Sequence, residues 1–107
     1  MTQPSKHPSR RLKRRAWLQL QASLALNEGD EVDAQTLLHR ITQNNPSASR
    51  RGWCHCTAVS LSQMMRQAEA YGLIKRLQKF KGGPFTYCLP DEGVDEARVR
   101  FVDRKTA

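Results

Sequence analysis

Hydrophobic residues recur at three- and four-residue steps in the first half of the chain, a spacing that places them on one face of an α-helix. A first helix is predicted from Arg10 onward, and Gly29 ends it because glycine suits the left-handed backbone position after a helix. A second helix is predicted at residues 34–43, with Asp33 as its N-cap, and Val32 before it fits a short strand or a core position. The hydrophobic positions are Leu12, Ala16, Trp17, Leu20 and Leu24 in the first helix and Leu37, Leu38 and Ile41 in the second.

A third helix follows the polar sequence NNPSASRRG, which itself predicts a long loop. Ser60 and Gln63 have the spacing of a capping box, in which each side chain satisfies a free backbone N–H of the other residue. Val59 and Met64 stand at the positions of a hydrophobic staple, and Thr57, one turn earlier, is a competing start. The predicted buried face consists of Leu61, Met64, Met65 and Ala68.

The residues after the third helix predict a β-hairpin. Gly72 ends the helix, and the sequences LIKRLQKF and FTYCL form two strands joined by the turn KGGP. Because Ile74 and Leu77 have opposite parity, we expect a bulge or a local twist in the first strand. The alternating hydrophobic positions of the second strand, which we expect to face the core, are Phe85, Tyr87 and Leu89.

The two ends of the chain fall outside this pattern. Residues 1–9 contain two prolines and no core-forming side chain, which predicts a disordered basic arm. Residues 91–107 fit a helix or a strand and form a C-terminal segment that is either a dimer contact or disordered. The order helix, short strand, helix, loop, helix, hairpin therefore predicts one α+β, mainly α domain over residues 10–90.

Charge is sorted along the chain. The 18 Lys and Arg residues outnumber the 10 Asp and Glu residues, which gives a formal net charge of +8. Residues 34–90 carry eight Lys or Arg and a single acid, Glu69, whereas the other acids collect mainly at residues 28–33 and 91–96. A basic surface of this kind indicates a polyanionic partner, most often nucleic acid. The chain has no hydrophobic run of membrane-spanning length and no apolar segment after its basic N-terminus, so we expect a soluble, cytoplasmic protein.

The sequence SLSQMMRQAEAYGLIKRLQKFKGGPFTYCL, together with the two preceding helices, resembles the winged helix-turn-helix superfamily of DNA-binding proteins. Bacterial winged-helix regulators often end their recognition helix in a Gly-Leu-Ile type sequence that runs into the first strand of the wing. Here these residues are Gly72, Leu73 and Ile74. The resemblance implies three helices plus a β-hairpin wing, with the third helix in the major groove. The chain departs from the pattern in the long interval between the second helix and Ser60.

Rotation of 100° per residue turns one face of the third helix away from its buried positions. Glutamine and arginine pair with adenine and guanine edges, and Ala70 leaves room for a thymine methyl group. The basic residues of the wing and of the N-terminal run suit the phosphate backbone. The predicted DNA-binding residues are Ser62, Gln63 and Arg66 in the third helix, Lys75, Arg76, Lys79 and Lys81 in the wing, Arg50 and Arg51 before the third helix, and Arg14 and Arg15 in the N-terminal run.

These residues predict a sequence-specific double-stranded DNA-binding protein, either a small transcriptional regulator or an accessory factor of a mobile element. Because such domains often bind two half-sites as dimers, the first helix or the C-terminal segment is a candidate for a homodimer contact. Two alternatives use the same basic surface, namely RNA binding and a winged-helix adaptor that binds an acidic protein. We infer no membrane partner and no small-molecule substrate.

The sequence WCHC raises the question of a metal site. Cys54, His55 and Cys56, with Cys88 and His39 elsewhere, supply the right ligand types, but C-x-C spacing is weaker than the C-x-x-C spacing that zinc prefers. Free cysteines are usually small buried hydrophobic residues, so we predict no metal and no cofactor. The chain also lacks the G-x-x-x-x-G-K-[ST] and G-x-S-x-G motifs, and we expect that it is not an enzyme.

Overall fold

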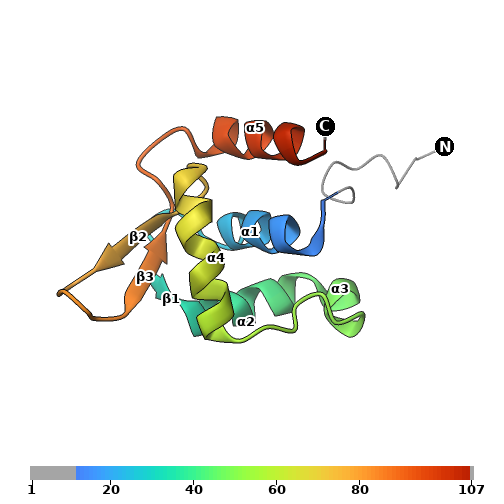
Figure 1. The fold of residues 1–107 in the computed structure, drawn as a ribbon, viewed down its shortest axis with the longest axis horizontal. Helices are drawn as coiled ribbons and strands as arrows, with labels where there is room; N and C mark the ends of the chain where they lie inside the picture. The colour runs from blue at the N-terminus through green and yellow to red at the C-terminus, as the bar shows by residue number, and fades with distance from the viewer. Residues whose placement is uncertain (1–11, 107) are drawn as a thin grey trace.

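The computed structural model describes residues 12–106. The predicted arm at residues 1–9 and the predicted helix start at Arg10 lie outside this range. Among residues 12–106, no helix has the length and hydrophobicity needed to cross a membrane. The elements of this range are α1 (Arg14–Leu24), β1 (Val32–Asp33), α2 (Ala34–Asn44), α3 (Pro46–Arg50), α4 (Ala58–Ala70), β2 (Lys75–Gln78), β3 (Phe85–Cys88) and α5 (Val94–Thr106) (Figure 1). The predicted α+β, mainly helical class is confirmed.

The three strands form one antiparallel sheet in the order β1–β3–β2. Tyr87 is the central position of its core-facing side, because it lies opposite Val32 on one neighbouring strand and Arg76 on the other. The predicted hairpin and the short strand at Val32 are therefore confirmed. The expected bulge is wrong, since β2 and β3 pair in unbroken register. The parity conflict disappears because Ile74 lies in the core just before the ladder begins, while Leu77 lies on the outer face of the sheet.

The core lies between α1, α2, α4 and the inner face of the sheet, and α5 closes it at the end of α4 (Figure 1). Leu24 is an exception to the predicted pattern, because its side chain is 49% exposed. Helix α1 is covered on several sides, and Leu24, its last residue, lies on the side left open. The largest fully buried hydrophobic side chains are Tyr87, Phe101, Leu18, Leu37, Ile41, Leu61, Met65, Leu73 and Ile74.

Helix α4 begins one turn earlier than the capping-box pattern predicted. The Thr57 hydroxyl accepts a hydrogen bond from the Ser60 backbone N–H at 3.0 Å, so Thr57 is the N-cap and the competing start is correct. Val59 therefore lies in the first turn, where its side chain is 68% exposed and forms no staple. At the other end Gly72 has φ of +80°, and the Leu73 N–H donates to the Ala68 carbonyl at 3.0 Å. This hydrogen bond closes the helix in a Schellman motif.

The interval before α4 is more ordered than the predicted polar loop. It contains α3, a five-residue helix with Pro46 in its first turn. Trp53 then packs edge-to-face against Trp17 of α1, with ring centroids 5.4 Å apart. The Arg14 guanidinium donates to the Trp53 carbonyl at 3.1 Å and also to the His55 carbonyl. These contacts fix the α3–α4 connection to the start of α1.

Residues 94–106 form a helix, which settles the choice between helix and strand for this segment. Ala97 and Phe101 face inward, and the Phe101 ring meets the Tyr71 ring with centroids 5.0 Å apart. Arg98 donates to the Ser23 hydroxyl at 2.9 Å and to the Ser23 carbonyl at 2.8 Å. Helix α5 is therefore anchored to both α1 and the end of α4.

Candidate nucleic-acid interface

One face of α4 is exposed and carries no acid. Its buried side consists of the four predicted residues, and its exposed positions form a stripe along the helix. Within this stripe the Gln67 side chain is engaged, because its Oε1 accepts from Gln19 Nε2 at 3.1 Å and from Arg15 Nε at 3.5 Å. The exposed stripe consists of Val59, Gln63, Arg66, Gln67 and Ala70.

Ser62 does not share this exposed face, although helical rotation alone placed it there. Its side chain is half-buried, and its hydroxyl oxygen accepts a hydrogen bond from the Tyr87 hydroxyl at 3.0 Å. The reason is tertiary, because the Tyr87 side chain reaches from β3 to the flank of α4 on which Ser62 lies. Ser62 therefore links the helix to the sheet.

Both cations at the root of the hairpin, Lys75 and Arg76, have ion-pair partners within the chain. Glu69, the single acid between residues 34 and 90, accepts from the Arg76 backbone N–H at 3.1 Å and from Arg76 Nε at 3.0 Å. The Arg76 guanidinium also lies 4.5 Å from the centre of the Phe85 ring, and its side chain is only 18% exposed. Lys75 forms a longer, exposed ion pair with Asp91 at 3.4 Å. Sequence reasoning assigned both cations to DNA, whereas here each has a partner within the chain.

The tip of the hairpin, residues 79–84, has a different character. Lys79 and Lys81 are exposed, and no ion pair joins either of them to another residue in the described part of the chain. The turn is shaped by Gln78, whose Nε2 donates to the Gly83 carbonyl at 2.6 Å. The Phe80 ring packs so closely over Gly83 that a Cβ there would lie 2.8 Å from it. The tip is therefore an ordered loop that presents two ammonium groups to solvent.

The predicted basic residues near the start of the chain divide in the same way. The Arg14 guanidinium donates hydrogen bonds to two backbone carbonyls of the α3–α4 connection. Arg15 Nε donates to Gln67 Oε1 on α4 at 3.5 Å, and the same oxygen accepts from Gln19. The Gln67 and Gln19 side chains are both uncharged, so this contact does not neutralise Arg15. Arg50 and Arg51, at the end of α3, are exposed.

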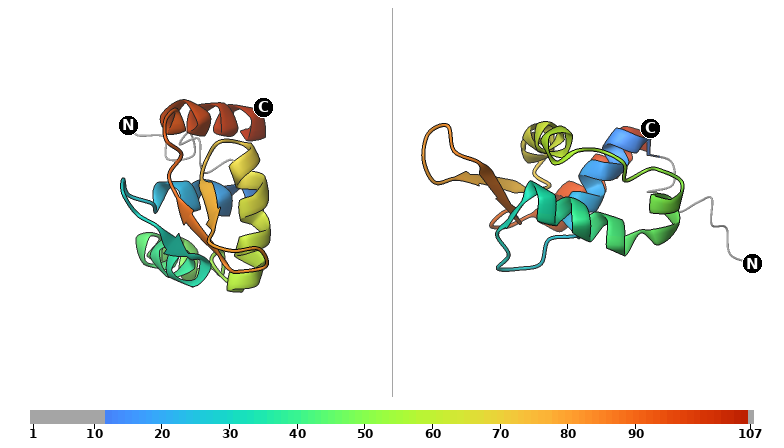
Figure 2. Two further views of the ribbon diagram at one scale, coloured as in Figure 1. Left: turned by 90° about the vertical axis from the view of Figure 1, so that its left-hand side faces the viewer. Right: turned by 90° about the horizontal axis from the view of Figure 1, so that it is seen from below.

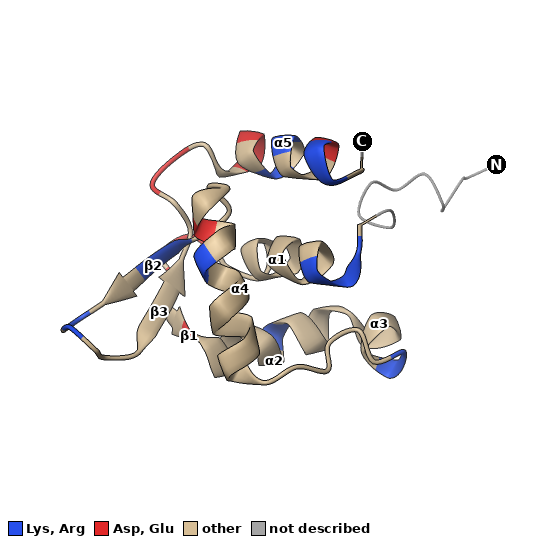
Figure 3. Cartoon of the chain, in the orientation of Figure 1, with Lys and Arg blue, Asp and Glu red and all other residues tan. Residues whose placement is uncertain are grey.

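Subtracting the internal ion pairs leaves a smaller set of free cations than the sequence indicated. Of the eight Lys and Arg residues at positions 34–90, Arg40, Lys75 and Arg76 are paired with Asp30, Asp91 and Glu69. Figure 3 shows the others along the long axis of the molecule, at the hairpin tip, on α4 and at the end of α3. In the right-hand view of Figure 2 the tip curls toward the side on which α4 lies. This cationic face consists of Arg50, Arg51, Arg66, Lys79 and Lys81.

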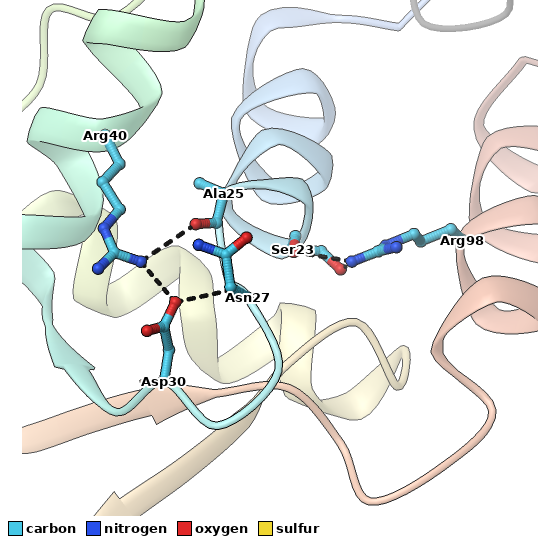
Figure 4. Close-up of polar contacts among 6 residues, drawn as sticks. All are labelled: Ser23, Ala25, Asn27, Asp30, Arg40 and Arg98. Carbon is cyan, nitrogen blue, oxygen red and sulfur yellow. Dashed lines mark hydrogen bonds and ion pairs between the residues drawn. The ribbon is translucent and has the colours of Figure 1, made fainter.

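The acids of the structure gather elsewhere, in residues 27–33 and 90–95, which we call the acidic loops. The two loops line a shared groove of about 490 Å³ beside the outer face of the sheet, together with Leu77 and Leu89. Asp30 accepts from the Asn27 backbone N–H at 2.8 Å and pairs with Arg40 at 2.6 Å (Figure 4). The Asn27 N–H and then the Arg40 charge hold the pKa of Asp30 below its usual value. The Asp30 carboxylate therefore helps to fix the first of these loops and joins it to α2.

The cysteine and histidine residues are spread over separate elements. Cys54 and Cys56 lie in the α3–α4 connection, Cys88 lies in β3, and the three thiols are free. Burial raises the pKa of each thiol, which favours its protonated form at neutral pH. Within residues 12–106 no group of three His, Cys, Asp or Glu side chains converges where a metal ion would be held.

Sequence reasoning missed one group of basic residues, which lies on α5. Arg100 and Arg104 line a cleft beside Ala70, the last residue of the α4 stripe. Their pattern gave no signal because residues 91–107 fitted both a helix and a strand. The close approach of Ala97 to Gly72 brings α5 to this position, and that contact joins residues distant in sequence.

Comparison with known proteins identifies no relative of this chain. No protein-family model matches it, and neither a curated protein nor a solved structure matches it. The functional assignment therefore depends on the chemistry of the surface described above.

Proposed function

We propose that the protein is a winged helix-turn-helix DNA-binding protein that places α4 in the major groove and the hairpin on the phosphate backbone. The observation that carries this proposal is the cationic face. Its five cations have no ion-pair partner among residues 12–106, and the one acid nearby, Glu69, is neutralised by Arg76. A surface that binds polyanions needs this combination, because each unpaired cation releases counterions when it meets a phosphate.

The exposed stripe of α4 supplies the groups for direct contact with bases. An α-helix fits the major groove, where the Arg66 guanidinium suits the O6 and N7 acceptors of guanine and the Gln63 amide suits adenine. Ala70 has a side chain small enough to lie against a thymine methyl group. We do not include Ser62 among the proposed base contacts, because its hydroxyl accepts a hydrogen bond from the Tyr87 hydroxyl.

The other cations suit the two flanks of the groove. Lys79 and Lys81 at the hairpin tip and Arg50 and Arg51 at the end of α3 lie on opposite sides of α4 along the long axis (Figure 3). This placement matches a duplex whose backbone is held on both sides of the helix that enters the groove. If these four cations each neutralise one phosphate, the logarithm of the binding constant falls with a slope of about −3.6 against the logarithm of salt concentration. Affinity then decreases roughly 150-fold between 50 and 200 mM salt.

The test is a fluorescence anisotropy titration of a labelled random-sequence duplex at several salt concentrations. We expect the double variant Arg66→Ala, Lys79→Ala to bind more weakly and to flatten the salt slope by about 0.9, since Lys79 gives up a phosphate contact and Arg66 a base-edge contact. The matched control is Leu24→Glu, Val99→Glu, which also lowers the net charge by two, at exposed positions of α1 and α5 away from α4. Circular dichroism establishes that both variants fold.

Three outcomes contradict the proposal in different ways. Equal binding by the double variant and the control means that α4 and the hairpin tip do not meet DNA. Stronger competition by single-stranded or A-form RNA than by duplex DNA identifies an RNA-binding protein that uses the same surface. Absence of any salt-sensitive nucleic-acid binding by the native chain favours an adaptor that binds an acidic protein.

A further inference from the structure

A second basic surface lies where α5 meets the end of α4. Between the two helices is a cleft of about 220 Å³, which we call the α4–α5 cleft. It is lined by side chains from the last turn of α4 and from three consecutive turns of α5. The lining residues are Ala70, Tyr71, Ala97, Arg100, Phe101 and Arg104.

The walls of this cleft are held by close packing. The chain turns at Gly72, where a Cβ would lie 3.3 Å from the Ala97 Cβ, so the glycine lets α5 approach closely. The Tyr71 and Phe101 rings meet edge-to-face at 5.0 Å, and Phe101 is 2% exposed. The backbone positions of the lining residues are therefore set by the core and not by surface loops.

The cleft is rich in positive charge. Arg100 and Arg104 are four residues apart and so share one side of α5, and both are exposed. Lys105 Nζ lies 5.0 Å and the Arg104 guanidinium 6.0 Å from the centre of the Tyr71 ring. The acids nearest in sequence, Glu96 and Asp103, form no ion pair with these cations in the described structure.

The positive charge around the cleft lowers the pKa of the Tyr71 phenol. The Lys105 ammonium, with the larger effect, and the Arg104 guanidinium together lower the pKa of Tyr71 below its usual value. The polar end of the tyrosine therefore faces a site that favours negative charge. Its hydroxyl is also a hydrogen-bond donor of the kind that commonly contacts phosphate oxygens.

The position of the cleft links it to the proposed DNA surface. Ala70 belongs both to the exposed stripe of α4 and to the lining of the cleft. In both views of Figure 2 the C-terminal end of α5 lies on the same side of the molecule as α4. A strand that passes the end of α4 therefore meets Arg100 and Arg104 next.

We propose that the α4–α5 cleft binds a backbone phosphate of the nucleic acid, beyond the groove that α4 enters. This inference rests on the proposed function. The two guanidinium groups offer paired N–H donors that match phosphate oxygens, and Tyr71 contributes a hydroxyl beside them. The cleft would thereby extend the footprint of the protein past α4, on the side away from the hairpin tip.

The proposal is tested by the double variant Arg100→Gln, Arg104→Gln in the same salt-dependent titration. Loss of one phosphate contact should reduce the salt slope by about 0.9 and weaken binding about fivefold at 150 mM salt. The control is again Leu24→Glu, Val99→Glu, which has the same change in net charge. Val99 is a matched position on α5 itself, because rotation of 100° per residue turns it to the side opposite Ala97. The variant Arg100→Lys, Arg104→Lys should keep most of the slope, since it keeps the charge.

A second measurement reports on the cleft directly and does not depend on binding affinity. The ring resonances of Tyr71 should shift when a duplex is added to the native protein, and the shift should be lost in the glutamine variant. Unshifted Tyr71 resonances, or a glutamine variant with the native salt slope, overturn the cleft while leaving the cationic face intact. A native chain that binds no duplex at any salt concentration overturns the proposed function itself.

Discussion

The cationic face and the acidic loops use charge in opposite ways. On the acidic loops and the elements they touch, several charged groups are bound to one another, to the backbone or to a hydroxyl (Figure 4). Asp30 holds both Arg40 and the Asn27 N–H, and Arg98 holds both oxygen atoms of Ser23. On the cationic face, the five cations have no such partner among residues 12–106. A charge change should therefore alter stability on the first surface and binding on the second.

The largest expected difference is between two arginines. Arg98 is 20% exposed and satisfies the hydroxyl and carbonyl of Ser23, which is fully buried. Arg98→Ala should therefore lower the free energy of unfolding by about 2 kcal/mol, because the buried Ser23 hydroxyl loses the Arg98 donor and the Ser23 carbonyl keeps only the Leu26 N–H. Arg66→Ala should lower it by less than about 0.5 kcal/mol, because Arg66 is exposed and has no hydrogen-bond or ion-pair partner among residues 12–106. Urea denaturation of the two variants measures both values.

Equal losses of unfolding free energy in Arg98→Ala and Arg66→Ala would contradict the proposed difference between the two surfaces. They would mean that Arg66 supports the fold and that its effect on DNA binding is indirect. The conservative variant Arg98→Lys is a useful third point. It keeps the charge but cannot contact both Ser23 oxygens with one planar group, so it should recover only part of the lost stability.

The ion pair of Glu69 and Arg76 lies where the two kinds of surface meet, at the root of the hairpin. Glu69→Gln should lower the free energy of unfolding by about 1.5 kcal/mol, since a charge-assisted bond to a mostly buried arginine is weakened. The same change removes the one acid beside the cationic face and releases Arg76. Duplex affinity should therefore rise, by about fivefold at 150 mM salt if Arg76 gains one phosphate contact.

The control for this variant is Asp91→Asn, which breaks the exposed pair with Lys75. Asp91 is 88% exposed, so its ion pair should contribute little to stability. Lys75 also lies on the outer face of the sheet, so its release should leave duplex affinity near the native value. Unchanged or weaker DNA binding by Glu69→Gln would place the root of the hairpin outside the interface.

These contrasts show which parts of the molecule are predictable from sequence. The Asp33 cap, the three principal helices and the hairpin depend on neighbouring residues, and the structure confirms each of them. Helix α3 escaped prediction because five residues with one buried side chain carry no periodic pattern. The same locality explains why the exposed positions Gln63 and Arg66 were correctly placed on the surface of α4.

The departures from the predicted exposure at the candidate site arise from contacts between distant elements. Ser62 is half-buried and bonded to the Tyr87 side chain of β3, and Arg76 pairs with Glu69 because the chain reverses at Gly72. A count of charges along the sequence cannot separate a paired arginine from a free one. The separation requires the fold, and it changes which of the predicted DNA contacts are available.

The smallest expected effect tests the acidic loops through pH. Hydrogen bonds from Thr36 hold the pKa of Asp33 below its usual value in the folded state. A carboxyl group with a lowered folded pKa stabilises the protein above its unfolded pKa of about 3.9, and this contribution is lost as the pH falls through the folded value. Asp33→Ala should therefore cost about 1 kcal/mol at pH 7, and its difference from the native chain should shrink below pH 4.

Asp33→Asn separates the cap from its charge. Asparagine caps a helix about as well as aspartate but does not titrate, so this variant should be nearly as stable as the native chain at pH 7 and less sensitive to acid below pH 4. Urea denaturation at pH 7 and pH 3 gives both differences. Neither variant should change the salt slope of DNA binding, because Asp33 lies on the acidic loops. A change in that slope would show that the acidic loops take part in binding and that the two surfaces do not divide their roles as proposed.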